Sequence, residues 1–420
     1  MKRVLQIIAT ITIPGVASDT KLSRQPTASF FPVLRFFKTD QTTNTNMMFS
    51  VPHAIFNTLI LSLVLMLGTS SCKPRSASES PATSETEPLP TSEFVHEDAV
   101  TKIAFGSCFN PRSNKPQIFE GILKHQPEVF VFLGDNIYAD TSDMEVMRKK
   151  YAELAAVEGF QKLRDTATVL ATWDDHDYGV NDGGNTYKMR DESQQILVDF
   201  FQDPEDSPRR ERPGVYASYS FGPDGKKVQV LLLDTRYFRD VLPSAKSKRK
   251  EGTIGWYESV DDPSLTLLGE TQWQWLEEQL QVPADLRIIA SSIQVLAYEK
   301  GMENWGHVAH EQKRLFGLLK KYQANHTFAI SGDVHFTEIS KIDLDGYPFY
   351  DFTSSGMSGA RPEWASAINS FRVGESKAVM NAGIIEINWV SKTIELAAIN
   401  PKGEKLFSET VKLSDLVFEK

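Results

Sequence analysis

The chain has 420 residues and a formal net charge of −10, with 41% hydrophobic and 24% charged residues. A chain of this length can form one large α/β unit with a substantial core. The acidic balance excludes a surface built to bind duplex nucleic acid, because phosphate backbones are met by clustered Lys and Arg side chains. The one dense basic run, KSKRKEG from Lys246, fits a solvated loop.

The first hundred residues differ in character from the rest. The run AIFNTLILSLVLMLGTSSC has about the length of a signal-peptide core and ends in small residues before Cys72. It resembles a bacterial lipoprotein signal, which implies that Cys72 is lipidated and begins the mature chain. A plain transmembrane anchor is the alternative. We therefore predict an N-terminal extension and lipoprotein-type signal over residues 1–72, and an exported protein held at the membrane, either periplasmic or at the cell surface.

Residues 73–97 are rich in Ser, Thr, Pro and Glu and lack a hydrophobic face. Such a segment cannot offset the entropy lost on ordering, so we predict a disordered linker there and a folded domain over residues 98–420. Cys72 and Cys108 are the only cysteines. If Cys72 is lipidated, Cys108 is a lone thiol in an exported protein, either a small buried hydrophobic side chain or a residue with a chemical task.

Strand and helix patterns alternate along the folded part. Helices are expected in NKPQIFEGILKH, in residues 143–157 and 189–201, and in ETQWQWLEEQL and HEQKRLFGLLKKY. Buried strands are expected in VTKIAFGSC, PEVFVFLGD, TATVLATWDDHD, KVQVLLLDTR, LRIIASSIQVLAY and NHTFAISGD, and alternating strands in the tail, including GIIEINWV and TIELAAIN. Uninterrupted apolar strands are typical of sheets that are covered on both faces, which indicates the α/β class.

Five polar motifs, GSC, GDNIY, WDDHD, DTR and GDVH, each follow the carboxyl end of an expected strand. Ligand sites of α/β sheets gather at those ends, so we expect the motifs to converge on one cleft. The stretch LATWDDHDYGVNDGG crowds Asp174, Asp175 and Asp177 around His176. Because like charges repel and unpaired buried charges are costly, either water solvates these carboxylates or a cation lies among them.

The side chains of these motifs offer mixed oxygen, nitrogen and sulfur donors. Such a set suits one or two hard or borderline cations. Zinc alone would favour a narrower Cys and His set, and the Asp spacing of an EF-hand is absent. A Ser-His-Asp triad is disfavoured because GxSxG is missing. The candidate donors are Cys108, Asp135, Tyr138, Asp174, Asp175, His176, Asn181, Asp333 and His335.

The same motifs carry a family resemblance. GDNIY resembles the Gly-Asp-x-x-Tyr signature of calcineurin-like metallophosphoesterases, WDDHD stands where these have Gly-Asn-His-Glu or Asp, and GDVH stands where they have Gly-His-x-His. With GSC and DTRYFRD, the set resembles the PhoD-like alkaline phosphatase/phosphodiesterase family over roughly residues 100–340. The resemblance implies a four-layer αββα sandwich of two mixed sheets, and metal-dependent hydrolysis of phosphomonoesters and/or phosphodiesters outside the cytoplasm.

The resemblance also implies a role for each residue. Ferric iron (Fe3+) would be bound by Cys108, Asp135, Tyr138 and His335. Calcium (Ca2+) would share Asp135 and take Asp175, Asn181 and Asp333. His176 matches the histidine that helps to neutralise the phosphate or to protonate the leaving group, and Arg236 with Arg112 would hold phosphate oxygens. In NWGHVAHE the chain departs from the family's Trp-Asp-x-Tyr segment, because Gly306 and Val308 replace its Asp and Tyr.

Two functions from different classes remain at this point. One is a phosphoesterase that acts on a small phosphate ester, as a monomer. The alternative is a membrane-tethered metal-binding lipoprotein without turnover. His176 and Arg236 beside a complete donor set favour the enzyme.

Overall fold

The computed structural model describes residues 91–113, 117–244 and 249–419. The predicted signal segment, Cys72 and the linker up to residue 90 lie outside these ranges. None of the helices in the described ranges combines the length and the apolar character needed to cross a bilayer.

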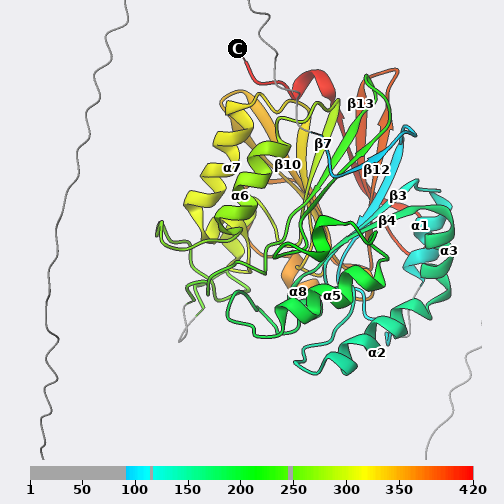
Figure 1. Cartoon of the computed structure of the whole chain (residues 1–420). Helices are drawn as coiled ribbons and strands as arrows, with labels where there is room; N and C mark the ends of the chain where they lie inside the picture. The colour runs from blue at the N-terminus through cyan, green and yellow to red at the C-terminus, as the bar shows by residue number, and fades with distance from the viewer. Residues whose placement is uncertain (1–90, 114–116, 245–248, 420) are drawn as a thin grey trace, which may run out of the picture. The chain divides into compact units, whose positions relative to one another are not determined.

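Two mixed sheets pack against each other through one hydrophobic core (Figure 1). The first runs β1-β5-β6-β7-β8-β10-β9-β11 and the second runs β14-β13-β12-β2-β3-β4. In that order, the strands of the first sheet span Phe94–His96, Ala217–Phe221, Val228–Leu232, Leu286–Ser291, Thr327–Ser331, Tyr347–Ser354, Thr337–Leu344 and Arg372–Lys377. Those of the second span Lys405–Lys412, Thr393–Ile399, Ala382–Asn388, Lys102–Gly106, Val129–Leu133 and Thr168–Thr172.

Each sheet has a parallel centre. Strands β6, β7, β8 and β10 run parallel, as do β2, β3 and β4. The parallel strands β3, β6, β7 and β8 are buried over their whole length, which explains their mainly apolar sequences. Between the sheets, the ring of Phe105 on β2 meets that of Phe352 on β10 edge to face, with centroids 4.9 Å apart. The two sheets therefore share an interior of directly packed side chains.

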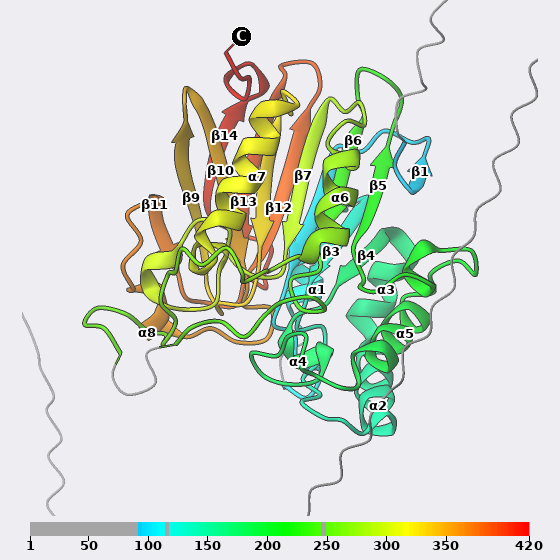
Figure 2. The same cartoon turned by 60° about the vertical axis from the view of Figure 1, so that its left-hand side comes forward.

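Helices cover both outer faces (Figures 1 and 2). Helices α6 (Gly269–Gln279) and α7 (Ala309–Lys321) bury Trp273 and Leu315 in the core that includes the first sheet. Helices α1 (Ile118–Lys124), α2 (Met144–Ala155) and α3 (Glu158–Thr166) bury Phe119, Met147 and Phe160 against the second sheet, and α5 (Arg190–Phe200) contacts α2. The order helix, sheet, sheet, helix confirms the predicted αββα sandwich. Short helices α4 (Asp175–Tyr178), α8 (Pro362–Ala365), η1 (Pro208–Arg210), η2 (Tyr298–Lys300), η3 (Trp305–His307) and η4 (Leu413–Asp415) occupy the connections.

The WDDHD segment differs from its predicted strand. Strand β4 ends at Thr172 and α4 begins at Asp175. Asp174 precedes the helix in an extended conformation, and its backbone N–H donates to Asp177 Oδ1 at 2.7 Å. Carboxylates at these positions satisfy the free N–H groups of a helix start. The preference of Asp side chains for helix starts, rather than hydrophobic periodicity, determines the structure of the WDDHD segment.

The boundary predicted between the linker and the folded domain, at residues 97 and 98, lies inside the folded domain. Strand β1 pairs in parallel with β5, and the ring of Phe94 stacks on that of Tyr219 with centroids 4.6 Å apart. Glu93 forms an ion pair with Arg212. The last residues of the predicted linker, 94–96, are therefore a strand, because an aromatic side chain and a free sheet edge offset the cost of ordering them.

Candidate metal centre

The predicted donors come from the carboxyl ends of strands in both sheets. Cys108, Asp135 and Asp175 follow β2, β3 and β4 of the second sheet, whereas Asp333 and His335 follow β8 of the first. The packing of one sheet on the other therefore decides whether these side chains meet.

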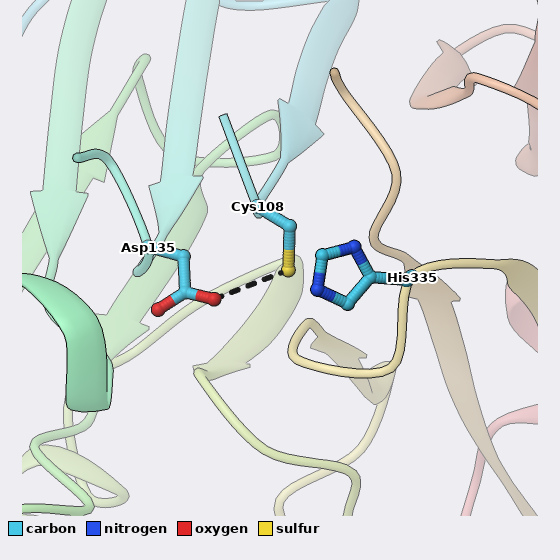
Figure 3. Close-up of side chains that lie close together, drawn as sticks. All are labelled: Cys108, Asp135 and His335. Atoms are coloured by element: carbon cyan, nitrogen blue, oxygen red, sulfur yellow. Dashed lines mark hydrogen bonds between the residues drawn. The ribbon is translucent and has the colours of Figure 1, made fainter. Parts of the chain in front are cut away.

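A first cluster joins Cys108, Asp135 and His335. Their ligand atoms all lie within 4.8 Å of one another, and Figure 3 shows the three side chains pointing toward a common centre. The thiol of Cys108 donates to Asp135 Oδ2 at 3.3 Å. The hydroxyl of Tyr138 lies 3.3 Å from Asp135 Oδ2 and 3.4 Å from His335 Nε2. All four side chains that the resemblance gives to iron thus lie together.

Asp135 also belongs to a second cluster, with Asp175 and His176. Its carboxylate is thus shared between two groups of donors, which is the arrangement that a bridging ligand requires. A third cluster joins Asp175 to Asp182 and Glu303.

Asp182 and Glu303 were absent from the predicted set. Glu303 lies in the connection that follows β7, so the strand-end rule that found the other motifs could have found it too. Asp182 stands next to the predicted Asn181. Its backbone N–H donates to Asp175 Oδ2 at 2.8 Å, and its side chain accepts from Tyr257. Asn181 itself is exposed.

The two predicted phosphate-binding arginines both pair with carboxylates of the protein. Arg112 forms a two-pronged pair with Glu153 of α2, with distances of 2.8 and 2.6 Å, and its side chain is 64% exposed. Arg236 is completely buried, and its Nη2 lies 2.5 Å from Asp174 Oδ1 and 2.7 Å from Glu303 Oε2. Arg236 therefore neutralises protein carboxylates, and the structure does not bring Arg112 to the clusters.

Asp177 fastens two of the donor loops to each other. Its Oδ1 accepts from the backbone N–H groups of Asp174 and Asp135, at 2.7 and 3.1 Å. Its Oδ2 accepts from the backbone and side chain of Asn136, at 3.2 and 2.6 Å. Burial raises the pKa of Asp177 to about 8, against the effect of these donors. The carboxyl group holds the GDNIY loop against the start of α4.

The backbone is strained where the donors project. Cys108, Asp135, Asp333 and His335 have φ angles of 58°, 50°, 72° and 52°. L-residues rarely adopt such angles, and each costs of order 1 kcal/mol or more. Four strained residues at the ends of β2, β3 and β8 indicate that the fold maintains the direction of these side chains at a cost to its own stability.

His176 lies beside the clusters with its ring fixed. Its Nδ1 is 2.8 Å from both carboxylate oxygens of Asp140, and the ring of Tyr138 lies against it with centroids 4.3 Å apart. Burial disfavours the charged imidazole, but the bond to Asp140 and the charge of Asp175 outweigh burial and raise the pKa of His176. Asp140, which the sequence analysis did not single out, thus orients the ring.

The electrostatics of these groups fit bound cations. Burial and the neighbouring Cys108 and Asp175 raise the pKa of Asp135 well above its usual value. Burial raises the pKa of the Cys108 thiol to about 12 and, together with Arg361, lowers the pKa of His335 to about 4, which keeps the imidazole neutral. Asp333 Oδ2 is buried without a hydrogen-bond partner among the described residues. A cation would stabilise the ionised carboxylates and thiolate and bind the neutral imidazole.

Replacing Asp177 with Ala should loosen the centre. Three buried backbone N–H groups and the Asn136 amide lose their acceptor, so we expect the free energy of unfolding to fall by about 3–5 kcal/mol. Metal affinity should fall about 10- to 100-fold because the donor loops are no longer held together. Urea unfolding and metal titration measure the two effects.

The matched control is Asp165→Ala, since Asp165 is exposed on the surface. It should change the unfolding free energy by no more than about 0.5 kcal/mol. Equal behaviour of the two variants would contradict the role given to Asp177.

Comparison with known proteins agrees with this geometry. Residues 103–395 match the family model of PhoD-like phosphatases. Alkaline phosphatase D of Bacillus subtilis (strain 168) is 22% identical over 294 residues, which cover 61% of this chain and 49% of the relative. The chain therefore spans about half the length of the curated relative that it matches.

One solved structure shows the same fold. A structure of PhoD superposes with a TM-score of 0.59 at 17% identity, covering 77% of this chain and 70% of that chain. A dimetal phosphatase from Danio rerio gives a TM-score of 0.42 at 12% identity, over 75% of this chain and all of that one. The family match extends over more than half of the sequence, and this chain belongs to the PhoD-like phosphatase family.

Proposed function

We propose that the protein is a metal-dependent phosphoesterase that hydrolyses small phosphomonoesters, phosphodiesters or both. The observation that carries the proposal is the position of Asp135, whose carboxylate belongs to two donor clusters at once. Membership in the PhoD-like family supports it. The metal-binding lipoprotein without turnover is less favoured, because a metal store does not need a histidine oriented by a carboxylate at the edge of the centre.

Two groups of side chains would hold the metals. One consists of Cys108, Tyr138 and His335, the other of Asp175 and Asp333, with Asp135 between them. The chemistry that such a pair supplies when bound is the activation of water and the neutralisation of phosphate oxygens. Glu303 and Asp182 are further oxygen donors beside Asp175.

The chain's own residues have separate tasks in this proposal. His176 is only partly buried, and because Asp140 occupies its Nδ1, its Nε2 is left to meet the substrate. From there it can hydrogen-bond the phosphate or give a proton to the departing alcohol oxygen. Arg236 offsets the charge of Asp174 and Glu303, so that the carboxylates of the centre can lie close together.

Asp135→Asn tests the shared carboxylate. We expect hydrolysis of p-nitrophenyl phosphate and bis-p-nitrophenyl phosphate to fall by more than about a hundredfold, beyond the effect of losing a supporting contact to a ligand. Bound metal should fall as well, while circular dichroism stays unchanged. Asp165→Asn serves as the control. Near wild-type turnover with full metal content in Asp135→Asn would overturn the bridging role.

For the identity of the metals, we propose ferric iron and calcium. Phenolate and thiolate stabilise oxidised iron by donating charge to it. Cys108 belongs to the first cluster, and the hydroxyl of Tyr138 lies 3.3 Å from Asp135 Oδ2 of that cluster. Asp175 and Asp333 offer oxygen alone, which calcium prefers.

The purified protein should therefore be coloured by charge transfer from phenolate or thiolate to iron. Tyr138→Phe should shift or bleach this band, measured by visible absorption. Calcium chelation should stop activity before the colour is lost, because the two ions occupy chemically different pockets. A colourless and fully active protein containing only zinc would disprove the iron assignment and leave the phosphoesterase proposal standing.

We further propose that the protein acts outside the cytoplasm as a monomer attached to the membrane through lipidated Cys72. The support is the resemblance of the segment before Cys72 to a lipoprotein signal. Detergent partitioning together with mass spectrometry of the mature N-terminus tests it, and a soluble chain without an acyl group would reject it.

A further inference from the structure

A recess of about 540 Å³ lies between the segment around Trp256 and the segment around Tyr298. Cavities of this size are typical of small-molecule sites. Aromatic and charged side chains dominate its walls. The most important for its chemistry are Trp256, Tyr257, Tyr298, Lys250, Glu258 and Glu299.

Tyr257 connects the recess to the centre. Its hydroxyl donates to Asp182 Oδ2 at 2.7 Å, and Asp182 belongs to the cluster with Asp175 and Glu303. One side chain therefore has its ring in the recess wall and its hydroxyl on a carboxylate of the centre. The recess and the third cluster are therefore separated by this one side chain.

One wall of the recess is formed by two backbone segments that pack closely against each other. The N–H groups of Ile254 and Gly255 donate to the carbonyl of Lys300 at 2.9 and 3.0 Å, and that of Tyr257 donates to Gly301 at 3.0 Å. A Cβ on Gly255 would lie 1.9 Å from the Gly301 carbonyl oxygen, so a larger residue cannot fit without a backbone shift. The segment that receives these bonds starts at η2 with Tyr298 and leads on to Glu303. The same segment thus lines the recess and carries Glu303 of the third cluster.

The lining selects the kind of group that can enter. Trp256 is 49% and Tyr298 38% exposed, which offers flat rings for stacking, and Arg249 lies over the indole of Trp256 at 5.3 Å. Glu251, Glu258 and Glu299 face two cations, Lys250 of the lining and Arg249 over Trp256, so the charges nearly balance with a small negative excess. A nearly balanced lining with a negative excess does not attract a second phosphate and favours an uncharged partner.

We propose that the recess binds the alcohol part of the substrate and that this part is an uncharged group with a flat face, such as a nucleobase or an aryl ring. The assignment rests on the proposed phosphoesterase function. In the reaction the oxygen of water forms a new bond to phosphorus, and the bond between phosphorus and the alcohol oxygen breaks. The alcohol oxygen takes up a proton and the alcohol leaves. The recess sets which alcohols are held during this exchange.

The test compares adenosine 5′-monophosphate, which carries a flat base, with glycerol 3-phosphate, which carries none. The ratio of their kcat/KM values should fall about tenfold in Trp256→Ala, because one stacking contact to a base is lost. Trp256→Phe keeps a ring and should hold the ratio within about twofold of wild type. An unchanged ratio in Trp256→Ala would overturn the proposal.

A second measurement does not depend on turnover. Calorimetry should detect binding of adenosine alone to the wild-type protein, and Trp256→Ala should weaken this binding about tenfold. If the wild type hydrolyses neither these two esters nor bis-p-nitrophenyl phosphate but binds adenosine through Trp256, the phosphoesterase proposal fails and the recess remains a binding site for flat uncharged groups. If it hydrolyses both esters and adenosine does not bind, the assignment of the recess fails alone.

Discussion

The packing of the two sheets against each other is the constraint on which the proposed metal centre depends. Asp135 and Cys108 project from the second sheet, and His335 projects from the first. Polar contacts tie the same edges together, since Thr172 Oγ1 donates to the Leu233 carbonyl at 2.9 Å and Ser292 Oγ donates to Asp174 Oδ1 at 2.7 Å. Because interiors are close-packed, the sheets cannot slide to repair a misplaced donor. The packing of the large core therefore sets the distances between the donor side chains of the metal centre.

The same packing of the sheets brings negatively charged side chains close together. Carboxylates that follow strands of both sheets are buried there. Arg236 pairs with Asp174 and Glu303, and Arg239 pairs with Glu303. Burial, together with the like charges around them, raises the pKa values of Asp135 and Asp333 well above their usual range. The strained backbone at Cys108, Asp135, Asp333 and His335 adds to the cost. Bound cations offset both, so metal binding should stabilise the fold as well as supply chemistry.

Local sequence predicted the parts of this protein that depend on local physics. Apolar runs located the buried strands, and the polar residues after them located the donors, because parallel strands end at one edge of a sheet. Side-chain direction depends on distant partners and could not be predicted. Arg236 turns to Asp174 and Glu303, Arg112 turns to Glu153, and Asp182 joins Asp175. Strand β1 escaped prediction for the same reason, since its order comes from the edge of β5.

Anomalous X-ray scattering from crystals of the purified protein tests the central claim most directly, because it locates cations without reference to activity. The account predicts two cation peaks on either side of the Asp135 carboxylate, one beside Cys108 and His335 and the other beside Asp175. A protein that turns over phosphate esters with a single peak, or with no peak in contact with Asp135, would contradict it.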